Sequence, residues 1–343
     1  MQTTVDARPV AAIDAGSNTI HLLVARLDGG RKTLRPLLDT ADMVRLGADV
    51  TEIGAIGPER AQRAIAAIRR QLELARELGA TVTLGIATEG VRRAANAQPF
   101  LDRVAGETGL RFDLITGAQE ASLAFWGATS ESTEFTGLRG VIDLGGGSLE
   151  LVAGENDTPG WRASLPLGAG AVRARYLPAD PPTLRELFGA WDALRGEMER
   201  LDPPLPVTDV TVCGGTATAL AAAAGRALRK HAERRSQPGA GAPPLASGQR
   251  RALTSASLDA LARELIRYDA EELTRRYHLK PGRAPLLIAG ALALLAGMER
   301  FGVDRLWVSH RGIREGALVA WRRVGLGWLD AAQSGSLERA ESA

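Results

Sequence analysis

Few residues in the sequence can form disulfides or bind soft metals. There is one cysteine, Cys213, and the four histidines are scattered without metal-ligand spacing. A single cysteine excludes an internal disulfide, and these counts together exclude a zinc cluster. We therefore expect a protein of the reducing cytoplasm.

Strong net charge and long apolar runs are also missing. The formal net charge is +2, although all but three of the 42 basic residues are arginines. A charge this small creates no overall field for nucleic acid, so we expect no DNA partner. The longest apolar segment, 284–298, is too short to span a bilayer, and the first ten residues lack the pattern of a secretion signal. We therefore expect no membrane association.

What the chain does contain is one short pattern used twice. An apolar run that leads into aspartate, glycine and serine occurs as "AAIDAGSNTI" at 11–20 and as "VIDLGGGSLE" at 141–150. Glycines let a backbone approach a ligand closely, and successive N–H groups in such a turn form a nest for an anion. Asp14 and Asp143 would repel a phosphate, so we expect them to hold a cation or a water that contacts it.

The apolar pattern around these motifs predicts two related halves. Each half opens with three strands joined by tight turns, at 9–37 and at 138–167, and continues with helices and further strands. This duplication predicts an α/β protein of the actin-like class. Its two domains would be ribonuclease H-like (the ASKHA architecture) and would face each other across a ligand cleft.

The length of 343 residues suffices for two domains of roughly 150 residues each. We predict actin-like domain I at 8–128, actin-like domain II at 129–312 and a helix at 313–325 that packs back on domain I. Two segments with little apolar content are predicted to lie outside the cores, a mobile insertion at 230–251 and a loose tail at 331–343.

Six segments, in one order, resemble motifs of the exopolyphosphatase and guanosine pentaphosphate phosphohydrolase family, Ppx/GppA. The two phosphate motifs of that family resemble 11–25 and 141–151, and "ITGAQEASLAFWG" at 115–127 is similar to the segment with its catalytic glutamate. The remaining three are "ATEGVRRAAN" (87–96), "CGGTATALAA" (213–222) and "VSHRGIREGAL" (308–318). The resemblance is to the short, two-domain members.

The resemblance implies roles for residues in these motifs. Glu120 would be the base that takes a proton from the attacking water. The metal would be Mg²⁺ or Mn²⁺, and Asp143 and Glu150 would bind it. Asp14 is a third candidate ligand, and the alternative for Asp14 is a structural role in the turn. The residues implied to bind phosphate are Ser17, Asn18, Arg92, Gly145, Gly146, Gly147, Ser148, Gly214, Gly215 and Thr216.

The chain departs from the family pattern in four places. Gln119 replaces the first glutamate of a pair, which leaves Glu120 as the catalytic candidate. Ser122 replaces an arginine, and His310 stands where aspartate is usual. Pro285 comes directly after "RA" (283–284), where the family often has an acid. We expect Ser122 and His310 to alter substrate binding or hinge geometry.

The activity implied by the resemblance is that of an exopolyphosphatase, which removes the terminal phosphate of inorganic polyphosphate. The 5′ phosphate of guanosine pentaphosphate (pppGpp) is the alternative target. Aromatic residues, which often stack on a nucleotide base, make up only 4% of the chain, so we favour polyphosphate. An actin-like kinase and a non-catalytic polyphosphate or alarmone sensor are the rivals from other classes. The resemblance also implies a homodimer.

Overall fold

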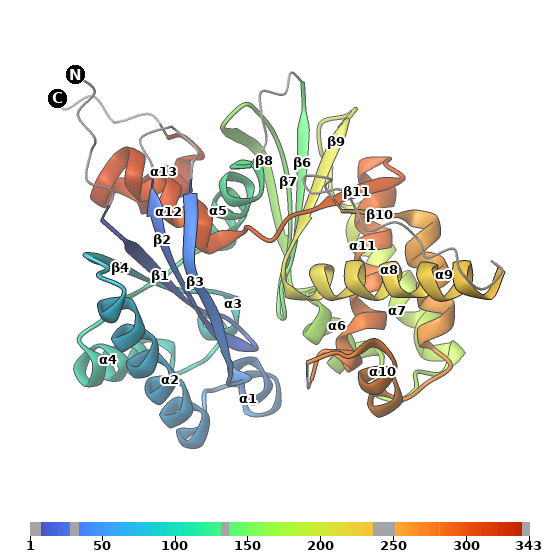
Figure 1. The fold of residues 1–343 in the computed structure, drawn as a ribbon, viewed down its shortest axis with the longest axis horizontal. Helices are drawn as coiled ribbons and strands as arrows, with labels where there is room; N and C mark the ends of the chain where they lie inside the picture. The colour runs from blue at the N-terminus through green and yellow to red at the C-terminus, as the bar shows by residue number, and fades with distance from the viewer. Residues whose placement is uncertain (1–7, 28–33, 132–136, 236–250, 281, 338–343) are drawn as a thin grey trace. The chain divides into compact units, whose positions relative to one another are not determined.

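The computed structural model describes residues 8–27, 34–131, 137–235, 251–280 and 282–337 (Figure 1). The chain divides into two compact units. Unit 1 comprises Met1–Thr136, Gly154–Ser164 and Arg311–Ala343, and unit 2 comprises Gly137–Ala153 and Leu165–His310. These described residues form one sheet of five strands and one of six, with helices beside both, so the α/β class predicted from the sequence is confirmed.

The sheet of unit 1 has the strand order β3-β2-β1-β4-β5. Its strands are β1 (Val10–Ala15), β2 (Thr19–Leu27), β3 (Leu34–Met43), β4 (Val82–Ala87) and β5 (Phe112–Leu114). Strands β1, β2 and β3 are antiparallel neighbours, whereas β4 runs parallel to β1 and β5 runs parallel to β4. Strand β3 extends well beyond the end predicted at residue 37, because it is an edge strand with mostly exposed side chains and so lacks a clear apolar pattern.

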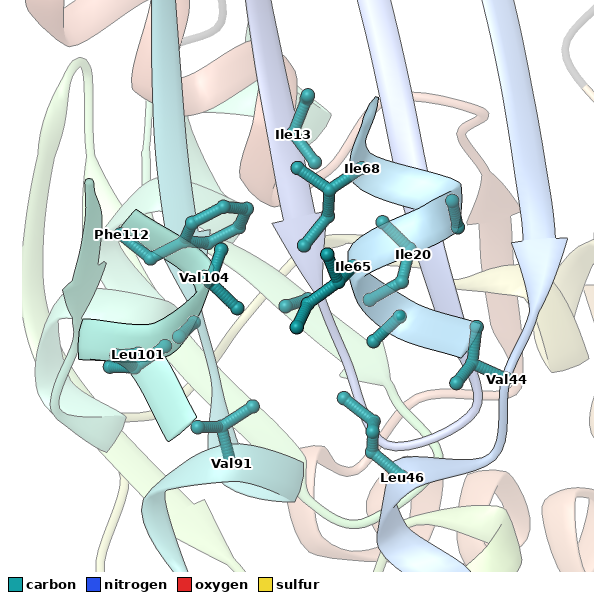
Figure 2. Close-up of a cluster of buried hydrophobic side chains, with 14 of the residues drawn as sticks. Ile13, Ile20, Val44, Leu46, Ile65, Ile68, Val91, Leu101, Val104 and Phe112 are labelled. Atoms are coloured by element: carbon teal, nitrogen blue, oxygen red, sulfur yellow. The ribbon is translucent and has the colours of Figure 1, made fainter. Parts of the chain in front are cut away.

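The helices of unit 1 in this region are α1 (Leu46–Ile53), α2 (Pro58–Glu77), α3 (Glu89–Arg92), α4 (Ala97–Thr108) and α5 (Gly117–Thr129). Helix α2 begins with Pro58, at a position where the missing N–H would have no partner in the helix. Its buried face includes Ile65 and Ile68, which lie in one cluster with Ile13 of β1 and Val104 of α4 (Figure 2). Complete burial of such a side chain contributes about 1.5–3 kcal/mol.

The C-terminal part of unit 1 contains α12 (Ile313–Val324), a 3₁₀ helix η1 (Gly325–Gly327) and α13 (Trp328–Ser334). Helix α12 packs on α5 so closely that only glycine fits at two places. A Cβ atom on Gly127 would lie 1.9 Å from the carbonyl oxygen of Gly312, and one on Gly316 would lie 1.9 Å from that of Leu123. This close packing fixes the position of α5, the helix that carries Glu120.

The six-stranded sheet has the order β10-β11-β9-β6-β7-β8. Its strands are β6 (Arg139–Leu144), β7 (Leu149–Glu155), β8 (Thr158–Leu165), β9 (Asp209–Cys213), β10 (Ala252–Thr254) and β11 (Arg305–Val308). The central strand β6 has a hairpin on one side and the parallel strands β9 and β11 on the other. The order β8-β7-β6-β9-β11 therefore repeats β3-β2-β1-β4-β5 of unit 1, which is the predicted duplication.

The helices of unit 2 are α6 (Ala169–Tyr176), α7 (Leu184–Glu199), α8 (Gly215–Arg235), α9 (Ser255–Leu265), α10 (Ala270–Tyr277) and α11 (Ala284–Phe301). Helix α11 is longer than the apolar segment noted in the sequence. By length and composition it is the one helix of the described residues that passes as a membrane span. However, 72% of that window is buried inside the protein, as in the core helix of a globular domain.

Two boundaries differ from the sequence prediction. Helix α8 continues to Arg235, so residues 230–235 of the mobile insertion predicted at 230–251 are helical. These residues are good helix formers, and the first proline comes only afterwards. The part at 236–250 lies outside the described residues. Helix α13 likewise runs to Ser334, into the tail predicted to be loose, and 338–343 lies outside the described residues.

Unit 1 also includes a segment that the sequence analysis assigned to domain II. Residues 154–164, at the adjoining ends of β7 and β8, group with unit 1. A contact within this unit shows why: the indole N–H of Trp126 on α5 donates to the carbonyl oxygen of Asp157 at 2.8 Å. The sequence could not predict this grouping, because residues 154–164 continue strands β7 and β8, which belong to the sheet of unit 2.

Candidate active site

The two glycine turns occupy equivalent places, between the first two strands of each sheet. In unit 1 the N–H of Gly16 donates to the carbonyl oxygen of Thr19 at 3.0 Å. In unit 2 the N–H of Gly145 donates to the carbonyl oxygen of Ser148 at 3.1 Å. Both predicted phosphate motifs therefore form the same tight hairpin.

The strands that leave each turn place two side chains opposite each other. In unit 1 the strand register pairs Asp14 with His21. In each turn one hydrogen bond joins two residues, and the aspartate lies two positions before the first of them. Counting two positions beyond the second residue gives His21 in unit 1 and Glu150 in unit 2, so Asp143 and Glu150 lie opposite each other on one face of the sheet. Opposed side chains have Cβ atoms roughly 5 Å apart, a separation at which two carboxylates can bind one cation.

In unit 1 a short helix binds the carbonyl side of the turn. The carbonyl oxygen of Asn18 accepts hydrogen bonds from the N–H groups of Val44 and Arg45, at 3.0 and 2.8 Å. The carbonyl oxygen of Ser17 accepts from Gly47 of α1 at 2.8 Å. Among the residues that the structure describes, the N–H groups of Ser17 and Asn18 donate to no backbone carbonyl. This arrangement suits an anion on the N–H side of the turn.

Helix α6 has the same relation to the turn of unit 2. The N–H of Gly168 donates to the carbonyl oxygen of Gly147 at 3.0 Å, and that of Gly170 donates to Gly146 at 2.8 Å. A Cβ atom on Gly168 would lie 2.6 Å from the carbonyl carbon of Gly146, so the helix start needs glycine. Neither α1 nor α6 was predicted, although each holds a predicted phosphate turn in place.

Ser17 sits in a crowded position next to a buried carboxylate. A Cβ atom on Gly90 would lie 2.4 Å from the Cα of Ser17, and one on Gly47 would lie 2.9 Å from its Cβ. The hydroxyl of Ser17 donates to Oε2 of Glu89 at 3.1 Å, and Glu89 is only 6% exposed. Oε1 of Glu89 is 3.1 Å from Nη1 of Arg93. The sequence analysis missed Glu89, an acid directly after the threonine of a family motif.

The carboxylates of Asp143 and Glu150 fit the donor set of a hard cation. Both are buried in unit 2, with exposed fractions of 6% and 1%. No group of three or more His, Cys, Asp or Glu that could hold a metal occurs within the described ranges, so protein atoms alone would not complete the coordination. Mg²⁺ commonly binds through one or two carboxylates and keeps water and substrate phosphate oxygens as its other ligands. The pair therefore fits Mg²⁺ bound together with a phosphate.

In unit 1 the position equivalent to Glu150 is occupied by His21, which belongs to a network with Asp39 and Arg314. Nε2 of His21 lies 2.7 Å from Oδ1 of Asp39, and Nη1 of the buried Arg314 lies 2.7 Å from the same oxygen. Burial lowers the pKa of His21, and this outweighs the opposite effect of Asp39. Burial would raise the pKa of Asp39, but the hydrogen bond from His21 and the charge of Arg314 hold that pKa well below its usual range. An imidazole with a lowered pKa therefore stands opposite Asp14, where unit 2 has a carboxylate.

The third glycine motif lies directly against the second phosphate turn. Gly214 has a φ of 102°, and a Cβ atom there would lie 2.3 Å from the carbonyl oxygen of Leu144 and 3.1 Å from Oδ1 of Asp143. Thr216, at the start of α8, is 2% exposed. The structure thus brings the predicted residues of unit 2 together at one end of β6 and β9.

Arg283 joins this group, and the sequence analysis did not select it. A Cβ atom on Gly215 would lie 2.5 Å from Nη2 of Arg283 and 2.9 Å from its Nη1, so the guanidinium rests on the start of α8. Burial lowers the pKa of Arg283. Within the described part of the chain this arginine has no ion pair. A half-buried guanidinium at a helix start is well placed to bind an anion.

Glu120 and Arg92 are in direct contact in unit 1. Glu120 lies in the first turn of α5 and is 4% exposed. Nη1 of Arg92 lies 3.2 Å from Oε2 of Glu120 and donates to the carbonyl oxygen of Ile115 at 2.5 Å. The predicted base and the predicted phosphate clamp therefore form one cluster, and the guanidinium stabilises the ionised carboxylate.

The sequence matches one family along most of its length. The sequence profile of the Ppx/GppA phosphatase family matches residues 23–323. The chain belongs to the Ppx/GppA phosphatase family. Family membership confirms the predicted enzyme class, a hydrolase of phosphoric anhydride bonds.

Members of the Ppx/GppA family with names and structures are similar over most of this chain. Exopolyphosphatase 1 of Mycobacterium leprae is 32% identical over 313 residues, which are 90% of this chain and 88% of that protein. Guanosine-5'-triphosphate,3'-diphosphate pyrophosphatase of Photobacterium profundum is 26% identical over 306 residues, 89% of this chain and 58% of that protein. The crystal structure of the Aquifex aeolicus family member has a TM-score of 0.73 and 30% identity, covering 91% of this chain and 97% of that one. The predicted actin-like fold is thereby confirmed.

Gln119, a departure from the Ppx/GppA pattern, has a structural role. The N–H of Thr116 donates to Oε1 of Gln119 at 2.8 Å, and the N–H of Gln119 donates back to Oγ1 of Thr116 at 3.2 Å. Nε2 of Gln119 also donates to the carbonyl oxygen of Leu329 at 3.1 Å. Glutamate could form the same capping box but could not donate to Leu329.

Ser122, where the Ppx/GppA pattern has arginine, contacts an arginine from elsewhere in the chain. Nη1 of Arg162, on β8, donates to Oγ of Ser122 at 2.8 Å. The same nitrogen donates to the carbonyl oxygens of Ala332 and Gln333 at 3.1 and 3.0 Å. Burial lowers the pKa of this guanidinium. Arg162 thus places a guanidinium beside Ser122 and connects α5 with α13.

Of the other two departures from the family pattern, one lies at a helix start and one in an exposed connection between two elements. Pro285 is in the first turn of α11, where a missing N–H costs no hydrogen bond. His310 is exposed and lies between β11 and α12, at the last position of unit 2. Nothing in the structure explains the histidine at 310.

Proposed function

We propose that the chain is an exopolyphosphatase that hydrolyses the terminal phosphate of inorganic polyphosphate, with Glu120 as the general base. The observation that carries this proposal is the contact of the buried Glu120 with the half-buried Arg92, whose Nη1 lies 3.2 Å from Oε2 of Glu120. It pairs a proton acceptor with a group that binds phosphate oxygens. The exopolyphosphatase relative, which is 32% identical and matched over 88% of its length, supports the choice of substrate.

In the proposed reaction Glu120 orients a water and accepts its proton. The water oxygen forms a bond to the terminal phosphorus, and the bond from that phosphorus to the bridging oxygen breaks. Orthophosphate and a polyphosphate shorter by one unit are the products. Because Arg92 uses Nη1 for Glu120 and Ile115, its remaining N–H groups are the ones that would bind the terminal phosphate.

The other predicted residues would bind the charge of the substrate. Asp143 and Glu150 would hold Mg²⁺ or Mn²⁺, and such an ion neutralises charge on the transferred phosphate. The N–H groups of the two glycine turns would bind phosphate oxygens. Arg283 adds a guanidinium to this set, at the start of α8.

Replacement of the base tests the proposal. We expect Glu120→Gln to lower kcat on polyphosphate by about 10²–10⁴-fold while polyphosphate binding persists, because the amide keeps the shape but cannot take a proton. Glu107→Gln is the matched control, since Glu107 is also a unit 1 carboxylate paired with arginine. Near-normal turnover in the Glu120 variant would refute the assignment. Binding of polyphosphate without turnover in the wild-type chain would favour a sensor.

Substrate choice is tested by a side-by-side comparison. We expect kcat/KM to be higher for polyphosphate than for pppGpp, and to fall more steeply with salt for long chains than for short ones. Faster and salt-insensitive cleavage of pppGpp would reverse the choice. Release of phosphate without any acceptor would argue against a kinase. We also propose a cytoplasmic location, which cell fractionation would test.

A further inference from the structure

The half-buried Arg162, on β8, joins two helices of unit 1 through a single nitrogen. Its Nη1 donates to Oγ of Ser122 on α5 at 2.8 Å. The same nitrogen donates to the carbonyl oxygens of Ala332 and Gln333 on α13 at 3.1 and 3.0 Å. These carbonyls belong to the last turn of α13, where the helix itself supplies no N–H for them. The guanidinium therefore caps the end of α13 and binds α5 at the same time.

Ser122 extends this contact to the first turn of α5. Its side chain is fully buried, and its hydroxyl donates to the carbonyl oxygen of Ala118 at 3.1 Å while it accepts from Arg162. Ala118 lies two residues before Glu120, in the same turn of the helix. A continuous chain of hydrogen bonds therefore runs from α13 through Arg162 and Ser122 to the turn that carries the proposed base.

Helix α13 packs on α5 and contacts its first turn at two further places (Figure 1). Nε2 of Gln119 donates to the carbonyl oxygen of Leu329 at 3.1 Å. Oγ1 of Thr116 donates to Oε1 of Gln333 at 3.0 Å. Both side chains on α5 come shortly before Glu120 in the sequence. The position of this turn therefore depends on α13, and the end of α13 is fixed by Arg162.

We infer that Arg162 is a positioning residue for Glu120, because it joins α13 to Ser122 and so fixes the first turn of α5. The inference rests on the proposed function, in which Glu120 takes the proton of the attacking water. A base acts only within hydrogen-bond reach of that water, and a misplacement of about 1 Å can cost about 10²-fold in rate. Loss of Arg162 should therefore lower kcat and leave the binding of polyphosphate unchanged.

A second arginine provides a matched control for a purely structural contact. Nη2 of Arg323, on α12, lies 2.8 Å from Oδ2 of Asp157. Arg323 thus joins a C-terminal helix to 154–164, the same segment that carries Arg162. Asp157 contacts the second half of α5, since its carbonyl oxygen accepts from Trp126. Arg323→Met therefore removes an ion pair of the same segment, but near the end of α5 that is far from the proposed base.

The first experiment measures the effect on α5 without any substrate, by amide hydrogen exchange of the full chain. We expect exchange at 116–122 to be at least about tenfold faster in Arg162→Met than in the wild type, because the turn opens more often. Ser122→Ala leaves the contacts of Arg162 with α13 in place and should give a smaller increase. Arg323→Met should exchange at 116–122 like the wild type. Circular dichroism of each variant shows that the fold is kept.

The second experiment measures steady-state hydrolysis of polyphosphate. We expect Arg162→Met to lower kcat by about 10–100-fold and Ser122→Ala to lower it by about 2–10-fold, with KM within about twofold of the wild type in both. Arg323→Met should keep kcat within about twofold of the wild type.

The third experiment combines Arg162→Met with Glu120→Gln. If Arg162 acts through Glu120, its replacement has little left to remove once the base is gone. We therefore expect the double variant to differ in kcat from Glu120→Gln by less than about twofold.

Three results would overturn the inference. One is unchanged hydrogen exchange at 116–122 in Arg162→Met. Another is a loss of activity in that variant that appears in KM and not in kcat. The third is an effect of Arg162→Met that multiplies with that of Glu120→Gln. Failure of the proposed function gives a different result: Glu120→Gln would then turn over at a near-normal rate, whereas exchange at 116–122 would still be faster in Arg162→Met.

Discussion

The two glycine hairpins have the same backbone but different side chains at the decisive position. Each has an aspartate at the end of the first strand, a tight turn and a short helix whose N–H groups bind the carbonyl oxygens of the turn. Opposite Asp143 stands the buried carboxylate of Glu150, whereas opposite Asp14 stands His21, bound to Asp39. A second carboxylate favours a hard cation such as Mg²⁺, which prefers oxygen ligands, whereas an imidazole suits softer metals.

A second difference concerns the turn itself. Strand β4 pairs Ile86 with Asp14 and strand β9 pairs Cys213 with Asp143, so Glu89 corresponds to Thr216. Unit 1 therefore has a carboxylate beside its turn where unit 2 has a hydroxyl. The duplicated backbone thus forms two equivalent glycine turns, and we propose that single side chains decide which of them binds a metal, with the metal in unit 2. On this basis we propose a structural role for Asp14.

Among the tests that compare the two hairpins, the largest expected effect concerns the proposed metal site. We expect Glu150→Ala to raise the Mg²⁺ concentration needed for half activity by about 10–100-fold, because one of two protein carboxylates is lost. His21→Ala, at the equivalent position of unit 1, should leave this concentration unchanged. Mg²⁺ titrations of polyphosphate hydrolysis measure both. An equal response of the two variants would break the distinction between the hairpins.

The next effect concerns the close packing behind each turn. We expect Gly90→Ala and Gly168→Ala each to cost about 1–3 kcal/mol in the free energy of unfolding and to lower kcat/KM, because a Cβ atom would push on Ser17 or Gly146. Urea denaturation and polyphosphate hydrolysis measure these changes. Gly106→Ala is the control: nothing lies within 4 Å of its added Cβ, and helix propensity should stabilise it by about 0.5–1 kcal/mol. Unchanged stability in both test variants would show that the turns tolerate displacement.

A smaller effect is expected at Glu89. Loss of its hydrogen bond with Ser17 removes about 0.5–1.5 kcal/mol, so we expect Glu89→Ala to raise KM for polyphosphate by about 2–10-fold without a change in the Mg²⁺ requirement. Glu89→Gln keeps an oxygen that accepts from Ser17 and should remain near the wild type in KM. Steady-state kinetics at saturating Mg²⁺ measure this. A rise in KM for the glutamine variant as large as for alanine would point to the charge of Glu89 instead.

The smallest effect is a pH dependence of stability. The pKa of His21 and that of Asp39 are both lowered by folding, so the folded chain binds fewer protons than the unfolded one. His21 therefore contributes to the free energy of unfolding above its unfolded pKa of about 6.5. This contribution is lost as the pH falls through the lower pKa of the folded state. We expect His21→Gln to lose less stability than the wild type between about pH 8 and about pH 5 in urea denaturation. A steeper loss in the variant would reverse the sign and contradict the lowered pKa of His21.

Much of the fold follows from local patterns that can be read directly. The apolar pattern around the two glycine motifs predicted the three-stranded hairpins at 9–37 and 138–167. Helices α1 and α6 escaped prediction because no side chain caps them: α1 begins after Arg45, whose φ is 62°, and α6 begins after Gly168. Their starts are fixed by hydrogen bonds to the turns, which are far away in sequence.

By itself the sequence determined the duplicated hairpins, the family and the list of candidate residues, because short motifs and periodic burial are local properties. Only the tertiary structure decided which candidates meet and which neighbours were missing from the list. Glu120 contacts Arg92, Ser17 contacts Glu89, and Ser122 contacts Arg162 through hydrogen bonds that span 28, 72 and 40 residues. Such partners are chosen by the packing of strands and helices, so no local pattern contains them.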